Sequence, residues 1–151
     1  MTITPFLWFD TQAEEAMTYY ASIFERSRIK AVHRAQGRVL SVEFELEGQP
    51  LMALNGGPHH RFTEAISLFV SCDTQADIDR LWAKFIGDGG TPDQCGWLKD
   101  KFGLSWQIIP SSLGSLLSGG GDAARGGRVW NAMLQMVKLD VAGLQQAYDG
   151  N

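Results

Sequence analysis

The segment Gly56-Gly57-Pro58-His59-His60-Arg61 holds the only concentration of histidine in the chain. Imidazole is a common metal ligand, and it can bind an anion when protonated. Adjacent residues on an extended segment point to opposite sides, so His59 and His60 are poorly spaced to bind one metal ion together. Two interpretations stay open for this segment: a solvent-exposed surface loop, or the rim of a cavity where His59, His60 or Arg61 contacts an anionic ligand.

Covalent chemistry has little support in the sequence. A nucleophilic serine is often found in a G-x-S-x-G elbow, and the chain contains none. The two cysteines, Cys72 and Cys95, have no neighbouring base that would activate a thiol. We expect two reduced, semi-buried side chains, with a disulfide as the alternative.

Composition narrows the classes of function further. The chain has 151 residues, a net charge of −4 and scattered basic residues, which argues against nucleic-acid binding. No apolar stretch approaches the roughly 20 residues that span a bilayer. The amino terminus lacks the basic and apolar regions of a secretory signal, so we expect a cytoplasmic protein that contacts no membrane.

An internal repeat shows how the chain is organised. Asp10-Thr11-Gln12-Ala13 recurs as Asp73-Thr74-Gln75-Ala76, each time after a strand-like apolar run, at residues 3–9 and 65–72, and before a helical pattern. Thr11 with Glu14 fits a capping box, and Thr74 with Asp77 is a weaker version of it. Apolar residues then recur at helical spacing in both copies. They are Ala16, Tyr19, Tyr20 and Ile23 in the first copy and Ile78, Leu81, Trp82 and Phe85 in the second. The two sets superimpose only if one residue is deleted from the second copy.

Strand patterns follow each helix. In the first half, residues 40–46 alternate apolar and polar side chains, and further strands are expected at 28–34 and 50–55. In the second half, strands are expected at 91–94, 96–99 and 104–109, with Lys99, Asp100 and Lys101 in a solvated turn. The glycine-rich residues 119–127 suggest a mobile polar segment, residues 129–137 an amphipathic helix, and Asp140 the cap of a last helix.

These patterns predict an α+β protein built from two βαβββ modules, at 1–58 and 64–110, with a helical extension at 111–151. The sequence CGWLKDKFGLSWQI at 95–108 resembles the signature of PhnB-like proteins, often labelled demethylubiquinone methyltransferase-like, in the vicinal-oxygen-chelate (glyoxalase-type) superfamily. Residues 51–58, 62–66 and 132–140 resemble the same family. The resemblance covers nearly the whole chain, and it implies two modules whose sheets curl into a half-open barrel around a cavity.

The resemblance also indicates where metal ligands would lie in metal-dependent relatives. Near those positions this chain carries Ser67, Ala53 and Gln107, with Asn55 two residues after Ala53. A divalent ion needs several imidazole or carboxylate ligands that converge on one centre. We therefore expect no metal ion and no other cofactor.

Asn55, Gln107 and Ser67 are instead predicted to hydrogen-bond a ligand in a neutral cavity, with Trp8 and Trp106 as apolar lining and His59 at the rim. The alternatives are that the amides satisfy nearby backbone groups or face solvent, and that the tryptophans are simple core. Trp97 is a further lining candidate.

The function predicted from the sequence is the binding of a small molecule without a metal ion, by a protein that forms a homodimer, for which exposed faces of residues 129–137 could serve. The alternative is an enzyme of the same superfamily, of the lyase, isomerase or dioxygenase type. Methyl transfer from S-adenosylmethionine usually needs a glycine-rich turn after a parallel strand. Here the glycine clusters follow helices or lie in a linker, which argues against that activity.

Overall fold

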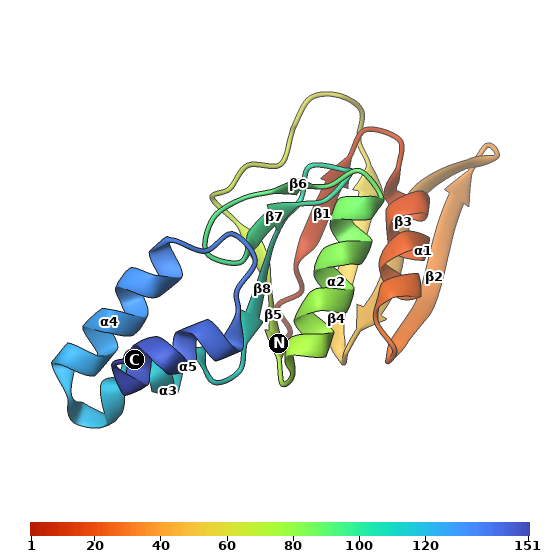
Figure 1. The fold of residues 1–151 in the computed structure, drawn as a ribbon. Helices are drawn as coiled ribbons and strands as arrows, with labels where there is room; N and C mark the ends of the chain where they lie inside the picture. Colours follow the sequence, from red (N-terminus) through yellow and green to blue (C-terminus); the bar gives the residue numbers. More distant parts are fainter. The chain divides into compact units, whose positions relative to one another are not determined.

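Each half of the chain folds as one strand, one helix and three further strands in the computed structural model, which describes residues 1–151 (Figure 1). The chain divides into two compact units, Met1–Phe62 and Thr63–Asn151, which we call unit 1 and unit 2. Unit 1 contains β1 (Phe6–Phe9), α1 (Ala13–Ile23), β2 (Ser27–Ala35), β3 (Arg38–Leu46) and β4 (Gln49–Asn55). Unit 2 contains β5 (Ser67–Cys72), α2 (Gln75–Gly87), β6 (Thr91–Pro92), β7 (Trp97–Lys99) and β8 (Ser105–Pro110), followed by α3 (Leu113–Leu117), a 3-10 turn (Gly119–Gly121), α4 (Ala123–Leu134) and α5 (Val141–Asp149).

The two sheets have the same topology. Their strand orders are β1-β4-β3-β2 and β5-β8-β7-β6, and in each sheet the first strand runs parallel to the last strand of its module while the other neighbours are antiparallel. This confirms the predicted α+β class with two βαβββ modules. The cavity shared by both modules stays a prediction.

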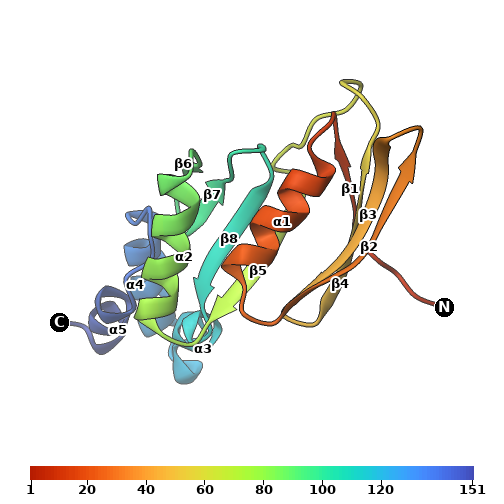
Figure 2. The ribbon, with the colours of Figure 1, turned by 90° about the vertical axis from the view of Figure 1, so that its right-hand side faces the viewer.

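The core of unit 1 lies between α1 and one face of its sheet (Figure 2). The predicted stripe of α1 is buried, and it meets the alternating apolar residues of β3. The Tyr20 and Phe44 rings stack with centroids 6.4 Å apart. Leu40, which lies on the same side of β3 as Phe44, is 51% exposed.

The helix caps differ from the prediction. α1 is not capped by Thr11, since its N-cap is Gln12 and makes no side-chain cap bond. Glu14 forms an ion pair with Arg34 at 2.5 Å instead of closing a capping box. The weaker candidate is the real cap, because the Thr74 hydroxyl accepts from the Asp77 N–H at 3.1 Å.

The core of unit 2 lies between α2 and β8. Ile78, Leu81 and Phe85 of α2 are buried, and the Phe85 ring lies 5.0 Å from the indole of Trp106. Asp100 is 4% exposed, so the predicted solvated turn is wrong for this residue. Its carboxylate accepts from the N–H groups of Phe102 and Leu104 and from the Trp106 indole.

The C-terminal helices of unit 2 pack around a second apolar cluster, whose buried members are Ile109, Leu113, Leu116, Val129, Met133, Leu139 and Leu144. Two corrections apply here. The glycine-rich segment forms the 3-10 turn and the start of α4, with Gly126 packed so closely on the Leu117 carbonyl that a Cβ would lie 2.2 Å from its oxygen. The helix predicted to reach residue 137 ends at Leu134. Asp140 caps α5 by accepting from Ala142 N–H, as predicted.

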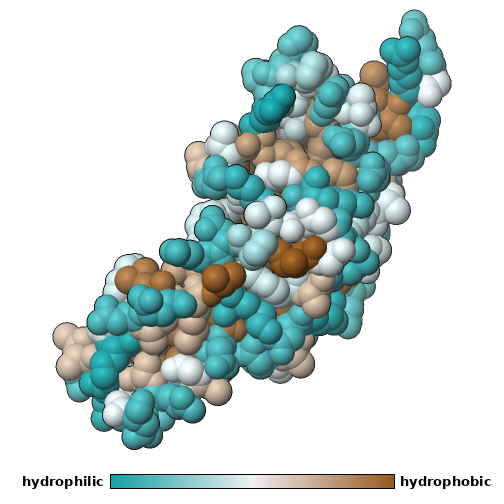
Figure 3. All heavy atoms as spheres, turned by 45° about the horizontal axis from the view of Figure 1, so that its top comes forward, coloured by the Kyte–Doolittle hydropathy of each residue, from teal (hydrophilic) through white to brown (hydrophobic).

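No helix here combines the length and the apolar composition that crossing a membrane requires. On the face that Figure 3 draws, hydrophobic residues lie in small groups separated by hydrophilic ones. No extended apolar patch therefore interrupts that face.

Candidate functional site

Unit 2 presents a polar face on the side of its sheet that α2 does not cover. Residues paired across neighbouring strands point to the same side, and consecutive residues point to opposite sides. Gln107 stands between Phe69 of β5 and Trp97 of β7, and Ser105 stands between Ser67 and Lys99. We call the side that carries these two rows the β8 face; its residues are Ser67, Phe69, Trp97, Lys99, Ser105 and Gln107.

Three neutral polar side chains lie together on the β8 face. The Gln107 amide donates from Nε2 to Oγ of Ser67 at 2.8 Å. This leaves Oε1 and the second N–H of Gln107, and the hydroxyl proton of Ser67, for other partners. Ser105 is 1% exposed, and its Oγ has no hydrogen-bond partner. A buried hydroxyl without a partner costs about 1–3 kcal/mol, a cost that a ligand or water oxygen would remove.

Aromatic and charged side chains border this polar group. Phe69 is 61% exposed, and Trp97 is half-buried in the same row as Gln107. Lys99 forms an ion pair with Glu64, and the hydrogen bond from its ammonium lowers the pKa of Glu64. The β8 face therefore offers amide and hydroxyl groups beside aromatic rings, and its one ionisable side chain is already paired.

Trp106, predicted as a lining residue, lies on the opposite face. It is 2% exposed and its indole donates to Oδ2 of Asp100 at 2.9 Å. Because Trp106 and Gln107 are consecutive on β8, the two side chains cannot contact one ligand on the same face. Sequence analysis missed Ser105 and Phe69, although Ser105 could have been found from strand alternation, since it precedes Gln107 by two residues.

Trp8 and the histidine segment lie together in unit 1. The Trp8 indole donates to the Gly57 carbonyl at 2.9 Å, and its ring lies 4.7 Å from that of His60 in an edge-on arrangement. A Cβ at Gly56 would lie 2.2 Å from the indole, so only glycine permits this packing. His59 is exposed in the turn after β4. These contacts give Trp8 a structural role, and a ligand contact by Trp8 or His59 stays a prediction.

Asn55 uses both ends of its amide on the backbone of unit 1. Oδ1 accepts from Ala13 N–H at 2.8 Å, and Nδ2 donates to the Val39 carbonyl at 3.2 Å. The first bond supplies the cap that α1 lacks. The arrangement corresponds to the alternative in which Asn55 satisfies backbone groups.

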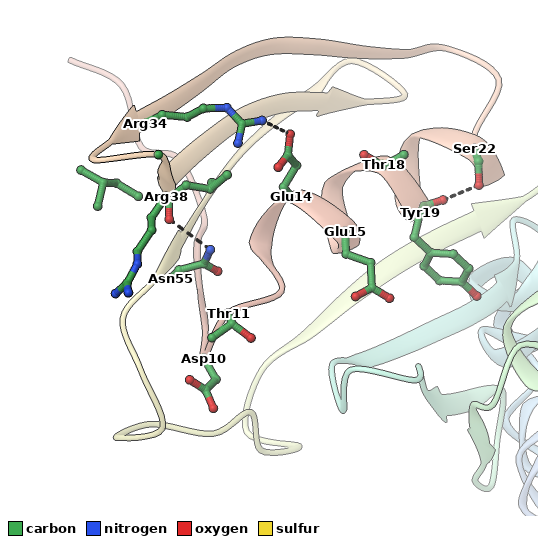
Figure 4. Close-up of a pocket in the computed structure, with 13 residues that line it drawn as sticks. Asp10, Thr11, Glu14, Glu15, Thr18, Tyr19, Ser22, Arg34, Arg38 and Asn55 are labelled. Carbon is green, nitrogen blue, oxygen red and sulfur yellow. Dashed lines mark hydrogen bonds and ion pairs between the residues drawn. The ribbon is translucent and has the colours of Figure 1, made fainter.

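Asn55 also borders a hollow of about 1040 Å³ between α1 and the end of the β2–β3 hairpin (Figure 4). Its wall carries charges of both signs, from Asp10, Glu14, Glu15, Arg34 and Arg38. Glu14 and Arg34 neutralise each other across it. No group of three or more His, Cys, Asp or Glu side chains is placed to hold a metal ion in this hollow or elsewhere.

The repeated βαβββ topology defines an α+β protein of two similar modules. A family model described as 3-demethylubiquinone-9 3-methyltransferase matches residues 1–109. The chain therefore belongs to this family, which includes the PhnB-like proteins.

Solved structures agree with this assignment. A PhnB protein from Bacillus cereus, described as a candidate 3-demethylubiquinone-9 3-methyltransferase, is 35% identical over 73% of this chain and 99% of its own, with a TM-score of 0.68. Protein PA1353 from Pseudomonas aeruginosa is 20% identical over 70% of this chain and 94% of its own, with a TM-score of 0.59, and shows the same fold. No significant match was found among curated proteins.

Proposed function

We propose that this protein binds a small, neutral, ring-containing molecule on the β8 face, without a metal ion. The observation that carries the proposal is the hydrogen-bonded pair Ser67–Gln107 beside the buried, unpartnered hydroxyl of Ser105. A ligand with a hydroxyl or carbonyl oxygen would complete this group. Binding sites commonly combine a few such polar groups with an apolar surround.

The aromatic residues favour a flat ring over a flexible polar chain. Phe69 and Trp97 stand on either side of Gln107 in one row, so a ring placed over Gln107 would contact both. The family description names a ubiquinone precursor, whose substituted ring bears oxygen atoms. A ring with one hydroxyl and one ether or carbonyl oxygen therefore matches both the chemistry of the face and the family description.

Binding without methyl transfer is part of the proposal. The turns from β1 to α1 and from β5 to α2 contain no glycine, whereas S-adenosylmethionine-dependent enzymes usually have a glycine-rich turn at this point of an α/β sheet. Isomerase or lyase chemistry would need a group that moves a proton. On the β8 face the one ionisable residue is Lys99, which Glu64 holds in an ion pair. The residues present thus support binding better than catalysis.

The proposal can be tested by ¹H–¹⁵N NMR with two simple probes. 4-Methoxyphenol has a hydroxyl group, and 1,4-dimethoxybenzene has the same ring without a donor. We expect 4-methoxyphenol to shift the Gln107 amide and Trp97 indole signals and to bind about 3–10-fold more tightly, which is the value of one hydrogen bond. Gln107→Ala should weaken binding by a similar factor, while Gln146→Ala, at an exposed position of α5, should leave it unchanged.

Three results would contradict the proposal. Equal affinity of the Gln107→Ala variant for 4-methoxyphenol would remove Gln107 from the site. Shifts confined to residues outside unit 2 would move the site elsewhere. A tenfold gain in affinity on adding Zn²⁺ or Mn²⁺, reversed by EDTA, would overturn binding without a metal ion.

A further inference from the structure

The ion pair between Glu64 and Lys99 lies at one end of the β8 face. Lys99 of β7 pairs in register with Ser105, and Ser105 pairs on its other side with Ser67 of β5. Glu64 lies in the turn that precedes Ser67. The ion pair therefore joins the segments on either side of β8, at the end of the face that holds the buried Ser105 hydroxyl.

Lys99 would attract anions to this end of the face if it had no partner. Its ammonium carries three N–H donors, and its side chain is 41% exposed. Trp97, which is part of the ring site proposed above, lies on the same strand and points to the same side of the sheet as Lys99. A ring seated there with a carboxylate directed toward Ser105 would bring that carboxylate to the Lys99 ammonium. An unpaired Lys99 would therefore favour aromatic acids over neutral rings.

Glu64 supplies a competing carboxylate from within the chain. The hydrogen bond from the Lys99 ammonium lowers the pKa of Glu64, so Glu64 is ionised at neutral pH. A carboxylate that is tethered to the protein competes at an effective concentration of about millimolar, well above that of a dilute ligand. Its charge also repels a second carboxylate at close range. An acidic ligand must displace Glu64 to reach Lys99, whereas a neutral ligand leaves the ion pair intact.

We propose that Glu64 determines the specificity of the β8 face by occupying Lys99, so that the face rejects rings with a carboxylate and accepts neutral rings with hydroxyl or carbonyl oxygens. This inference rests on the proposed function, because it assigns the ligand class of the same face. Selectivity here comes from a repulsive group as well as from attractive contacts.

Two ligands with the same ring test the inference at pH 7. 4-Methoxyphenol is neutral, and 4-methoxybenzoate carries a carboxylate. In ¹H–¹⁵N NMR titrations that follow the Gln107 amide, the wild-type chain should bind 4-methoxybenzoate more weakly than 4-methoxyphenol. Glu64→Gln keeps the shape of the side chain and removes its charge. The ratio of the two dissociation constants, benzoate over phenol, should then fall about 5–10-fold, less than the full value of a charge-assisted hydrogen bond because the site is half-exposed.

Further variants separate this role from a general effect on the fold or on the net charge. A variant that only loosened the turn before β5 would weaken both ligands and leave the ratio of their dissociation constants unchanged. In the double variant Glu64→Gln/Lys99→Met the gain in 4-methoxybenzoate binding should disappear, because no ammonium remains. Asp149→Asn, at an exposed position of α5, changes the net charge by the same amount and should leave the ratio unchanged.

The results also distinguish this inference from the proposed function. Equal affinity of the wild-type chain for the two ligands, an unchanged ratio in Glu64→Gln, or a gain that persists in the double variant would each overturn the role of Glu64, while 4-methoxyphenol would still shift the Gln107 amide. Absence of 4-methoxyphenol binding to the wild-type chain would overturn the proposed function itself, and this inference with it.

Discussion

Replacing Asp100 by asparagine should destabilise unit 2 strongly, although the two side chains have the same shape. Oδ1 of Asp100 accepts from Phe102 N–H at 2.8 Å and from Leu104 N–H at 3.0 Å, while Oδ2 accepts from the Trp106 indole at 2.9 Å. Asparagine has one oxygen and one NH₂ group. Whichever way it is turned, a donor then faces a buried donor. If the amide oxygen stays on the Phe102 and Leu104 N–H groups, the Trp106 indole loses its acceptor, and if the amide is flipped, those two N–H groups lose theirs.

The magnitude follows from the number and kind of these bonds. A hydrogen bond to a charged group contributes about 1.5–3 kcal/mol, and an unsatisfied buried donor costs about 1–3 kcal/mol. We expect Asp100→Asn to lower the free energy of unfolding by about 2–4 kcal/mol, a large part of the 5–15 kcal/mol typical of a protein. Trp106→Phe removes the indole donor while it keeps a ring against Phe85, and should cost about 1–2 kcal/mol alone.

Urea denaturation of the wild type, the two single variants and the double variant measures the coupling. In the Asp100→Asn background, Trp106→Phe removes a conflict between donors, so the two effects should fall short of additivity by about 1–2 kcal/mol. Asp93→Asn, at an exposed position before β7, is the control and should change stability by less than about 0.5 kcal/mol. A loss below about 1 kcal/mol for Asp100→Asn, or strict additivity of the two variants, would refute this reasoning.

Four further outcomes can be measured with the same protein. Asn55→Ala removes the acceptor at the start of α1 and should cost about 1–2 kcal/mol in urea denaturation, while 4-methoxyphenol binding stays unchanged; weaker binding would show that Asn55 contacts the ligand. Gly56→Ala puts a Cβ 2.2 Å from the Trp8 indole and should cost about 1–3 kcal/mol, whereas an unchanged midpoint would mean that the indole moves away freely. Gln75→Ala removes the bonds from its side chain to Leu139 carbonyl and Val141 N–H, so amide hydrogen exchange should rise first in α5; a uniform rise would contradict a local anchor. Burial raises the pKa of Cys72 from 9.0 to about 11, so at pH 8 it should alkylate about 100-fold more slowly than an ordinary thiol; its contribution to stability is full below pH 9 and is lost as the pH rises toward 11, and rapid alkylation of the native protein would contradict the shift.

Strand alternation and helix spacing were enough to predict the two modules. The apolar residues of β3 and the stripes of α1 and α2 report directly which side of each element is buried. The errors came where a distant segment decides the local structure. Thr11 does not cap α1 because Asn55, 42 residues away, bonds to Ala13 instead. The glycines of α4 look like a linker in sequence, yet Gly126 is helical because it packs on α3.

The candidate site was predictable in its residues and not in its geometry. Ser67 and Gln107 were each singled out from the sequence, but their hydrogen bond joins residues 40 positions apart. It depends on the register of β5 against β8, which the whole sheet determines. The burial of Ser105 is likewise a tertiary property. In contrast, the alternation of side chains along a strand already places Trp106 and Gln107 on opposite faces of the sheet.

The two copies of Asp-Thr-Gln-Ala precede helices that are capped in different ways. In unit 1 the cap of α1 comes from Asn55, which pairs with Phe9 at the end of β4. The equivalent position at the end of β8 is Pro110, paired with Cys72, and it has no polar side chain.

Thr74 therefore caps α2 with its own side chain. The next residue, Gln75, donates to the carbonyl of Leu139 in the segment that leads into α5. The Asn55 amide, at the end of β4, uses both of its ends in hydrogen bonds to the backbone of unit 1. Gln107, three residues before the end of β8, bonds only to Ser67 and keeps an oxygen and an N–H for another partner. This asymmetry is a physical reason to look for the ligand on the second sheet and not on the first.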